Sequence, residues 1–196
     1  MNDQQVSRFL RLINIIDILG IIIVLIIAFY FQFIFNELPC PLCLLQRLGL
    51  LAICFGFLLN IHYQPRPSHY ALSILAAIIT AMTAMRQILL HIEPGDQGYG
   101  SAVLGLHMYT WVFIFAALAI IYIAIILSIP RQYHLKKDSE KVVKPKNKLL
   151  RTFTSIAFLL FIALLIANII SLYLECGLKE CPDNPTNYII SFPYTK

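Results

Sequence analysis

The chain has 196 residues, of which 59% are hydrophobic and only 13% are charged, and its mean hydropathy is +0.77. This composition is too apolar for a soluble globular protein. The net charge of +5 would suit a nucleic-acid-binding protein, but most of the basic residues lie in one loop. That distribution argues against nucleic acid as a partner and indicates a membrane topology signal instead.

Five apolar stretches in the sequence predict membrane-spanning helices. They lie at about 12–36, 44–61, 70–91, 107–129 and 152–174, and the second is short. A helix needs about 20 residues to cross the roughly 30 Å of hydrocarbon in a bilayer. The first stretch is too long for a cleavable signal peptide, and no small-residue cleavage site follows it. The sequence therefore predicts an all-α integral membrane protein that crosses the membrane several times.

Lysine and arginine are distributed unevenly between alternate loops. Eleven lie in the N-terminal tail, the turn at 62–69 and the loop at 130–151, whereas the other loops and the C-terminal tail together contain two. Because cytoplasmic loops are enriched in lysine and arginine, we expect the N-terminus to be cytoplasmic. Five spans then place the C-terminal tail outside the cytoplasm.

This orientation places two closely spaced cysteine pairs on the outer side of the membrane. The pairs are Cys40 with Cys43 and Cys176 with Cys181, and the fifth cysteine, Cys54, lies inside the second span. An oxidising compartment such as the bacterial periplasm permits such pairs. We expect Cys54 to be a small, packed apolar residue.

The sequence Cys40-Pro41-Leu42-Cys43 stands where the second span begins. Proline is favoured at the first helical position, so Cys40 falls near the N-cap and Cys43 at the third position. Both sulfurs then lie at the positive end of the helix dipole, which favours a thiolate. Arg47 follows one turn later on the same face. Its guanidinium is suited to stabilising the Cys43 thiolate and to donating hydrogen bonds to a carbonyl ligand in the lipid.

Each of these features also has a purely structural interpretation. The C-x-x-C pair would then be a passive disulfide, Arg47 an anchor that extends to the interface, and the Cys176/Cys181 pair a clip that holds the tail. A further alternative takes all four outer cysteines as one zinc site. Redox chemistry would compete with metal at an oxidising face, and Arg47 would be an unusual neighbour for zinc, so we predict no metal site.

The two cysteine pairs share one side of the membrane, so their electrons cannot cross the bilayer between thiols. The electrons must leave into a lipid-soluble carrier, and a quinone is the obvious candidate. Arg86 and His91, at the outer end of the third span, are at the level of the C-x-x-C pair and are candidates for lining a quinone pocket. His107, from the fourth span, is a weaker candidate. Either of the first two equally suits an interfacial anchor.

The segment Pro-Cys-Pro-Leu-Cys-Leu-Leu-Gln-Arg at 39–47 resembles the quinone-reducing motif of the disulfide bond formation protein B (DsbB) family. The resemblance covers about residues 10–130 and includes the order of the first four spans. It implies a four-helix bundle, ubiquinone or menaquinone as electron acceptor, and a periplasmic thioredoxin-fold dithiol oxidase, similar to DsbA, as partner. It also implies that Cys43 engages the quinone, that Cys40 is its disulfide partner and that Arg47 is the quinone-side cation.

The sequence departs from the family in the position of its second cysteine pair. That pair usually lies between spans three and four, but residues 92–106 contain no cysteine. We expect Cys176 and Cys181 to take over the partner-facing role. The expected organisation is a DsbB-like bundle over 1–130, a basic cytoplasmic loop at 131–151, a fifth span at 152–174 and a periplasmic tail at 175–196.

The function predicted from the sequence is a membrane thiol:quinone oxidoreductase of the bacterial inner membrane that supports disulfide bond formation. Two alternatives stay open. One is an enzyme that runs in the opposite direction, as a disulfide or quinone reductase similar to the vitamin K epoxide reductase group. The other is a non-enzymatic membrane scaffold with two structural disulfides.

Overall fold

The computed structural model describes residues 3–63, 65–133, 148–182 and 184–190 and is built almost entirely from helices. Five of the helices in this part of the chain are long and apolar enough to span a membrane, which confirms the predicted class. They are α1 (Asp3–Ile34), α2 (Pro41–His62), α3 (Pro67–Leu90), α4 (Met108–Leu127) and α5 (Lys148–Cys176). The short second stretch of the sequence is a helix of 22 residues, because it begins directly after Cys40.

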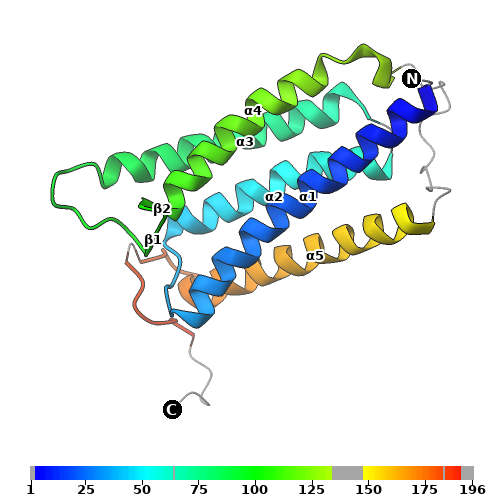
Figure 1. Ribbon diagram of the computed structural model, residues 1–196. Helices are drawn as coiled ribbons and strands as arrows, with labels where there is room; N and C mark the ends of the chain where they lie inside the picture. Colours follow the sequence, from blue (N-terminus) through cyan, green and yellow to red (C-terminus); the bar gives the residue numbers. More distant parts are fainter. Residues whose placement is uncertain (1–2, 64, 134–147, 183, 191–196) are drawn as a thin grey trace.

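The helices lie side by side along the long axis of the molecule (Figure 1). Helix α2 packs between α1 and α3, and α3 packs against α4. Helix α5 lies beside α1 and α2. The N-terminus lies at one end of the bundle, and the connection from α1 to α2, the loop before α4 and the chain after α5 lie at the other (Figure 1). Both cysteine pairs therefore belong to the same end.

Proline marks the start of two helices. Pro41 opens α2 and Pro67 opens α3, each in the first turn. Proline is tolerated there because the first backbone N–H groups of a helix have no partner within the helix. The preceding residues, Cys40 and Arg66, have extended backbone, as expected before proline. The starts of these helices are thus set locally by the sequence.

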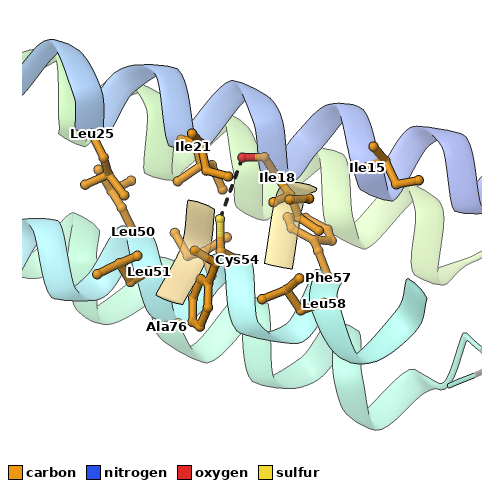
Figure 2. Close-up of a cluster of buried hydrophobic side chains, with 14 of the residues drawn as sticks. Ile15, Ile18, Ile21, Leu25, Leu50, Leu51, Cys54, Phe57, Leu58 and Ala76 are labelled. Atoms are coloured by element: carbon orange, nitrogen blue, oxygen red, sulfur yellow. Dashed lines mark hydrogen bonds between the residues drawn. The ribbon is translucent and has the colours of Figure 1, made fainter. Parts of the chain in front are cut away.

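The buried core takes residues from all five long helices, and Figure 2 shows the layer of it formed by α1, α2 and α3. Figure 2 labels ten of its residues, Ile15, Ile18, Ile21, Leu25, Leu50, Leu51, Cys54, Phe57, Leu58 and Ala76. Cys54 is fully buried in this layer, and its Sγ lies 3.9 Å from the carbonyl oxygen of Ile18. Cys54 is a free, packed thiol, as expected from its position in the second span. In a membrane such layers are stabilised by close packing rather than by exclusion of water.

Two glycines let α2 approach α3 closely. A Cβ atom added to Gly49 would collide with Thr80, and one added to Gly56 would collide with Ser73 and with the backbone of His69. Ser73 and Thr80 face α2 with their hydroxyls bonded to backbone carbonyls, at 2.9 and 2.7 Å. Small residues at a helix–helix contact permit this approach in membranes. The close contact fixes the position of α3 relative to the start of α2.

The chain between α3 and α4 carries a small hairpin instead of a helix. Strands β1 (Ala102–Val103) and β2 (Leu106–His107) pair antiparallel, and Leu104 and Gly105 between them both have positive φ. Positive φ at both central residues matches a two-residue hairpin turn. The glycines of this segment suit a non-helical loop, but the sequence analysis did not predict the hairpin. After α4, η1 (Pro130–Tyr133) leads into the basic loop, whose residues 134–147 lie outside the described residues.

Candidate active site

Cys40 and Cys43 form a disulfide at the N-terminus of α2, with their Cα atoms 5.0 Å apart. Cys40 is the N-cap residue, and its Sγ accepts a hydrogen bond from the backbone N–H of Cys43 at 3.1 Å. This geometry confirms the predicted start of the helix. An N-terminal helix position stabilises negative charge, so reduction of the disulfide leaves a sulfur where a thiolate is favoured.

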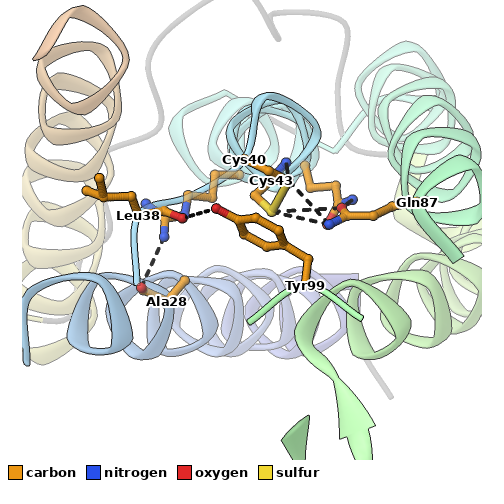
Figure 3. Close-up of a disulfide and its surroundings, with 8 residues drawn as sticks. Ala28, Leu38, Cys40, Cys43, Gln87 and Tyr99 are labelled. Atoms are coloured by element: carbon orange, nitrogen blue, oxygen red, sulfur yellow. Dashed lines mark hydrogen bonds between the residues drawn. A yellow bond between two sulfur atoms is a disulfide. The ribbon is translucent and has the colours of Figure 1, made fainter. Parts of the chain in front are cut away.

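A buried glutamine from α3 reaches this disulfide (Figure 3). The Nε2 group of Gln87 donates to Cys40 Sγ at 3.2 Å and to Cys43 Sγ at 3.5 Å. Its Oε1 accepts from Gln46 Nε2 at 2.8 Å. The sequence analysis did not single out either glutamine. The signal available in the sequence was an uncharged polar side chain within an apolar span. Gln46 also lies one turn past the C-x-x-C pair.

Arg47 is buried, with 7% of its surface exposed, and faces the interior of the bundle. Its guanidinium donates to Gln32 Oε1 at 2.5 Å and to the carbonyl oxygen of Ala28 at 3.0 Å. It also lies over the ring of Phe29, 4.7 Å from the ring centre, within the range of a cation–π contact. A side chain held in this way does not extend to the interface, so the geometry favours a site residue over an anchor.

A pocket between α1, α2 and α4 contains both Cys43 and Arg47. Its other lining residues are Val24, Leu25, Ala28, Phe31, Glu37, Leu38, Pro39, Gln46, Leu50, Tyr99, Gly100, Met108, Tyr109 and Val112. A second, almost wholly apolar pocket shares Val24, Leu50, Met108 and Val112 with it and continues past Ile27, Val103, Leu104, Trp111 and Phe115. Together the two pockets offer a few polar groups near the disulfide and an adjoining apolar channel.

Tyr99 extends from the loop between α3 and β1 into the first pocket (Figure 3). Its hydroxyl donates to the carbonyl oxygen of Leu38 at 2.5 Å. Burial, followed by the negative charges of Glu175 and Glu37, raises the pKa of Tyr99 to about 12. The phenol therefore keeps its proton near neutral pH. It is a hydrogen-bond donor beside Cys43, and the sequence analysis did not single it out.

Arg86 and His91 do not line this pocket. Arg86 is exposed and lines a separate groove between α3 and α4. The His91 ring bonds to Asp96 at 3.0 Å and stacks on Tyr109, with the ring centres 5.8 Å apart. The His107 ring also stacks on Tyr109, with the ring centres 5.3 Å apart. The two histidines thus contact a tyrosine of the pocket wall, whereas Arg86 stands apart.

The second cysteine pair closes a loop directly after α5. Cys176, the last residue of α5, is buried and forms a disulfide with Cys181, with the Cα atoms 4.5 Å apart. Gly177 follows with a φ of 60°, the left-handed conformation that commonly ends a helix. The chain then turns back, and the Ile190 amide donates to the Leu174 carbonyl at 3.1 Å.

The returning tail contacts the buried polar groups near Arg47. Gln32 Nε2 donates to the hydroxyl of Tyr188 at 3.2 Å, and the other side of the same amide accepts from Arg47. The tail therefore lies over the end of the bundle that holds the C-x-x-C pair (Figure 1). The four cysteines at this end of the bundle are engaged in two disulfides, and no group of three metal-binding side chains occurs in the described ranges.

Comparison with known proteins identifies similarity in the first half of the chain. Residues 10–100 match a family described as disulfide bond formation protein DsbB. This range is narrower than the resemblance noted in the sequence, because it ends before α4. Helix α5 and the Cys176/Cys181 pair lie outside it.

Curated proteins of the same description are similar over comparable ranges. A disulfide bond formation protein B of Stutzerimonas stutzeri is 32% identical over 91 residues, which are 44% of this chain and 56% of that protein. One of Chromobacterium violaceum is 36% identical over 74 residues, covering 36% of this chain and 45% of that protein. The chain thus spans about half the length of the curated relatives it matches. No solved structure matches the chain.

Proposed function

We propose, from the match of residues 10–100 to the DsbB family and from the similar curated proteins, that the chain is a membrane thiol:quinone oxidoreductase. It reoxidises a periplasmic dithiol oxidase of the thioredoxin fold, similar to DsbA, and passes the electrons to a membrane quinone. One observation carries the proposal. A disulfide at a helix N-terminus shares a largely apolar pocket with a buried arginine. A passive disulfide needs neither the pocket nor the arginine.

The residues of the pocket fit a quinone. A quinone is a flat ring with two carbonyl oxygens and an apolar tail, and it supplies the capacity to accept two electrons and two protons. Arg47 has five N–H donors and uses two contacts, to Gln32 and Ala28. Its remaining donors suit a carbonyl oxygen, and the adjoining apolar pocket suits the tail.

The proposed electron path uses the two disulfides in turn. A thiolate of the partner attacks the Cys176–Cys181 disulfide, the partner's second thiol resolves the mixed disulfide, and a tail dithiol is formed. The tail dithiol reduces Cys40–Cys43 by the same exchange. The Cys43 sulfur then gives up the electron pair to the acceptor beside Arg47, and attack by Cys40 on Cys43 restores the disulfide. Each cycle moves two electrons and two protons from the partner dithiol to the acceptor.

The orientation and the location belong to the proposal. The asymmetry of lysine and arginine supports a cytoplasmic N-terminus and periplasmic cysteines, in the inner membrane of a bacterium. The division into a bundle over 1–130, a basic loop at 131–151, a fifth span at 152–174 and a tail at 175–196 follows the same argument. Arg86 and His91 remain candidates for quinone binding only through longer contacts, since neither lines the pocket.

Quinone reduction by the purified protein tests the proposal. The protein in detergent is mixed with a reduced thioredoxin-fold donor and with ubiquinone or menaquinone, and quinol is followed by absorbance. We expect one quinol per donor disulfide and no turnover in Cys43→Ser. Quinol that forms at the same rate in Cys43→Ser would refute the proposal.

The redox state in cells separates this function from its alternatives. An oxidase rests with Cys40–Cys43 oxidised, whereas a reductase similar to the vitamin K epoxide reductase group rests reduced. A scaffold binds no quinone, and its C-x-x-C pair does not respond to a change in the redox buffer. Trapping of free thiols with an alkylating reagent, followed by mass spectrometry of the peptide, distinguishes the three.

A further inference from the structure

Helix α5 carries a stripe of polar side chains on its buried face. Asn168, Ser171 and Glu175 are 4%, 4% and 1% exposed. They are spaced by three and four residues, so they lie along one side of the helix. Polar and ionisable groups inside a membrane are costly and need partners. The partners of Glu175 are therefore informative.

Only one oxygen of the Glu175 carboxyl is satisfied. Its Oε1 accepts from Ser171 Oγ at 2.8 Å and from Gln32 Nε2 at 3.1 Å. Its Oε2 is buried and has no hydrogen-bond partner among the described residues. An unpaired buried oxygen carries a free-energy cost. That cost is relieved when the oxygen carries a proton or meets a donor, so this carboxyl is suited to a change of protonation.

One amide group joins Glu175 to Arg47. Gln32 donates to Glu175 with Nε2 and accepts from Arg47 with Oε1, at 3.1 and 2.5 Å. Arg47 is buried and forms no salt bridge with any of the described residues. A buried cation requires a compensating negative charge. Glu175 is the carboxylate that this network presents to it.

The other groups around this network do not supply that charge. Helix α1 contributes the uncharged Gln32, and the tail contributes the hydroxyl of Tyr188. The loop before α4 contributes Tyr99, which keeps its proton. Glu37 lies in the pocket wall, but both of its carboxylate oxygens are bonded to Ser101 at the exposed surface rather than to Arg47 or Gln32. Reduction of the disulfide adds a second candidate, since the Cys43 thiolate shares the pocket with Arg47.

We propose that Glu175 is a proton-holding residue that is ionised while the Cys40–Cys43 disulfide is closed and takes up a proton when the disulfide is reduced. The inference rests on the proposed role of this pair as a redox-active dithiol. The carboxylate balances Arg47 in the oxidised state, and the Cys43 thiolate balances it in the reduced state. One buried cation is thus matched by one anion throughout.

The proposed step balances in atoms, charge and electrons. Two electrons break the Cys40–Cys43 bond, one proton goes to the Cys40 sulfur, one goes to Glu175, and Cys43 remains a thiolate. Reoxidation returns both protons with both electrons. The net charge of the buried site is therefore the same in both states, which avoids the cost of an uncompensated charge in a medium of low dielectric constant. This assigns a chemical role to the fifth helix.

A glutathione redox buffer tests the proton count without quinone or protein partner. Two glutathione thiols release two protons when they reduce the disulfide, and the parent protein takes up both. At a fixed glutathione ratio, the parent's ratio of dithiol to disulfide should therefore be independent of pH between about pH 6.5 and pH 8, where glutathione is still a thiol. In Glu175→Gln one proton is lost to solvent, so the ratio should rise about tenfold per pH unit, or about 30 mV.

The quantity measured is the fraction of alkylated thiols in the peptide that contains Cys40 and Cys43. The tail disulfide lies in a different peptide and does not contribute to it. Glu180→Gln makes the same change at an exposed residue of the tail and should behave like the parent. Equal pH dependence in the parent and in Glu175→Gln, whether flat or steep, overturns the inference. The proposed function is untouched by that result, because the assay contains no quinone.

A measurement on the parent protein covers the case in which Glu175→Gln does not fold. Reduction of the disulfide should produce the infrared C=O stretching band of a protonated carboxyl, shifted in heavy water. A reduced-minus-oxidised difference spectrum without such a band overturns the inference.

Discussion

The side-chain amide of Gln87 donates to the Sγ atom of Cys40 at 3.2 Å, across the contact between α3 and the start of α2. The donor is held in place, because Gln46 donates to the other end of the same amide at 2.8 Å. Gln87 is 2% exposed, so no water competes freely for this bond. The same Nε2 group lies 3.5 Å from the Sγ atom of Cys43, the sulfur proposed to carry the thiolate, and a fixed donor there stabilises the negative charge that reduction creates.

Gln87→Leu should make the Cys40–Cys43 disulfide harder to reduce. The substitution keeps the volume similar but removes the donor, and hydrogen bonds to charged groups contribute about 1.5–3 kcal/mol. We therefore expect the equilibrium with glutathione to shift toward the disulfide by roughly 10- to 100-fold. Gln97→Leu, in the exposed outer loop, is the matched control. If both variants equilibrate like the parent, the Gln87 contact has no effect on redox chemistry.

Arg47→Ala should weaken quinone use while thiol exchange at Cys40–Cys43 continues. The guanidinium is the group placed to bind a carbonyl oxygen, and losing one charge-assisted hydrogen bond lowers kcat/KM for quinone by roughly 10- to 100-fold. Arg47→Lys keeps the charge but not the planar donor set, so we expect a partial loss. Both kcat/KM for quinone and the rate of thiol exchange at Cys40–Cys43 are measured with a small dithiol as electron donor.

Arg151→Ala serves as the control for this pair, since Arg151 is exposed on α5 at the opposite end of the bundle. A quinone KM in Arg47→Ala equal to that of the control would return Arg47 to a purely structural role.

Replacement of both Cys176 and Cys181 by serine should abolish oxidation of the protein partner. The tail pair is the only dithiol besides the C-x-x-C pair on the outer end, within the described residues. Cys40–Cys43 should still pass electrons from a small dithiol to quinone. The measurement is the rate of disulfide formation in the purified partner, together with the quinol yield.

A structural clip predicts the opposite pattern, with a less stable protein that still oxidises its partner. Leu178→Ser, within the loop closed by this disulfide and 94% exposed, is the control that keeps both cysteines. Normal partner oxidation in the double serine variant would mean that the C-x-x-C pair works alone.

The orientation can be tested at two exposed positions on opposite ends of the bundle. Gln97→Cys lies in the loop before α4 and Ser68→Cys in the first turn of α3. With intact cells, a membrane-impermeant thiol reagent should label the first and label the second only after lysis. The reverse pattern would invert the topology and place both disulfides in the cytoplasm. Thr195, in the last residues of the tail, lies outside the described residues, so these two positions are the better reporters.

Local features of the chain could be predicted from the sequence alone. A membrane span satisfies its backbone hydrogen bonds internally, so a long apolar stretch is enough to predict a helix, and five were found. The start of α2 at Pro41, with Cys40 as N-cap, follows from the conformational limits of proline. The family resemblance rested on the same short segment, and residues 10–100 match that family.

Contacts between helices were decided by the tertiary structure. Gln87 reaches Cys40, Arg47 turns toward Gln32, and Arg86 lies in a different groove although it precedes Gln87 directly. Which side chains meet depends on the rotation of each helix about its own axis, and spans that are apolar on all sides carry little information about that rotation. Packing of small residues such as Gly49 and Gly56 against α3 sets it instead. Sequence thus determined the spans and the cysteine motif, and packing decided which polar groups surround the disulfide.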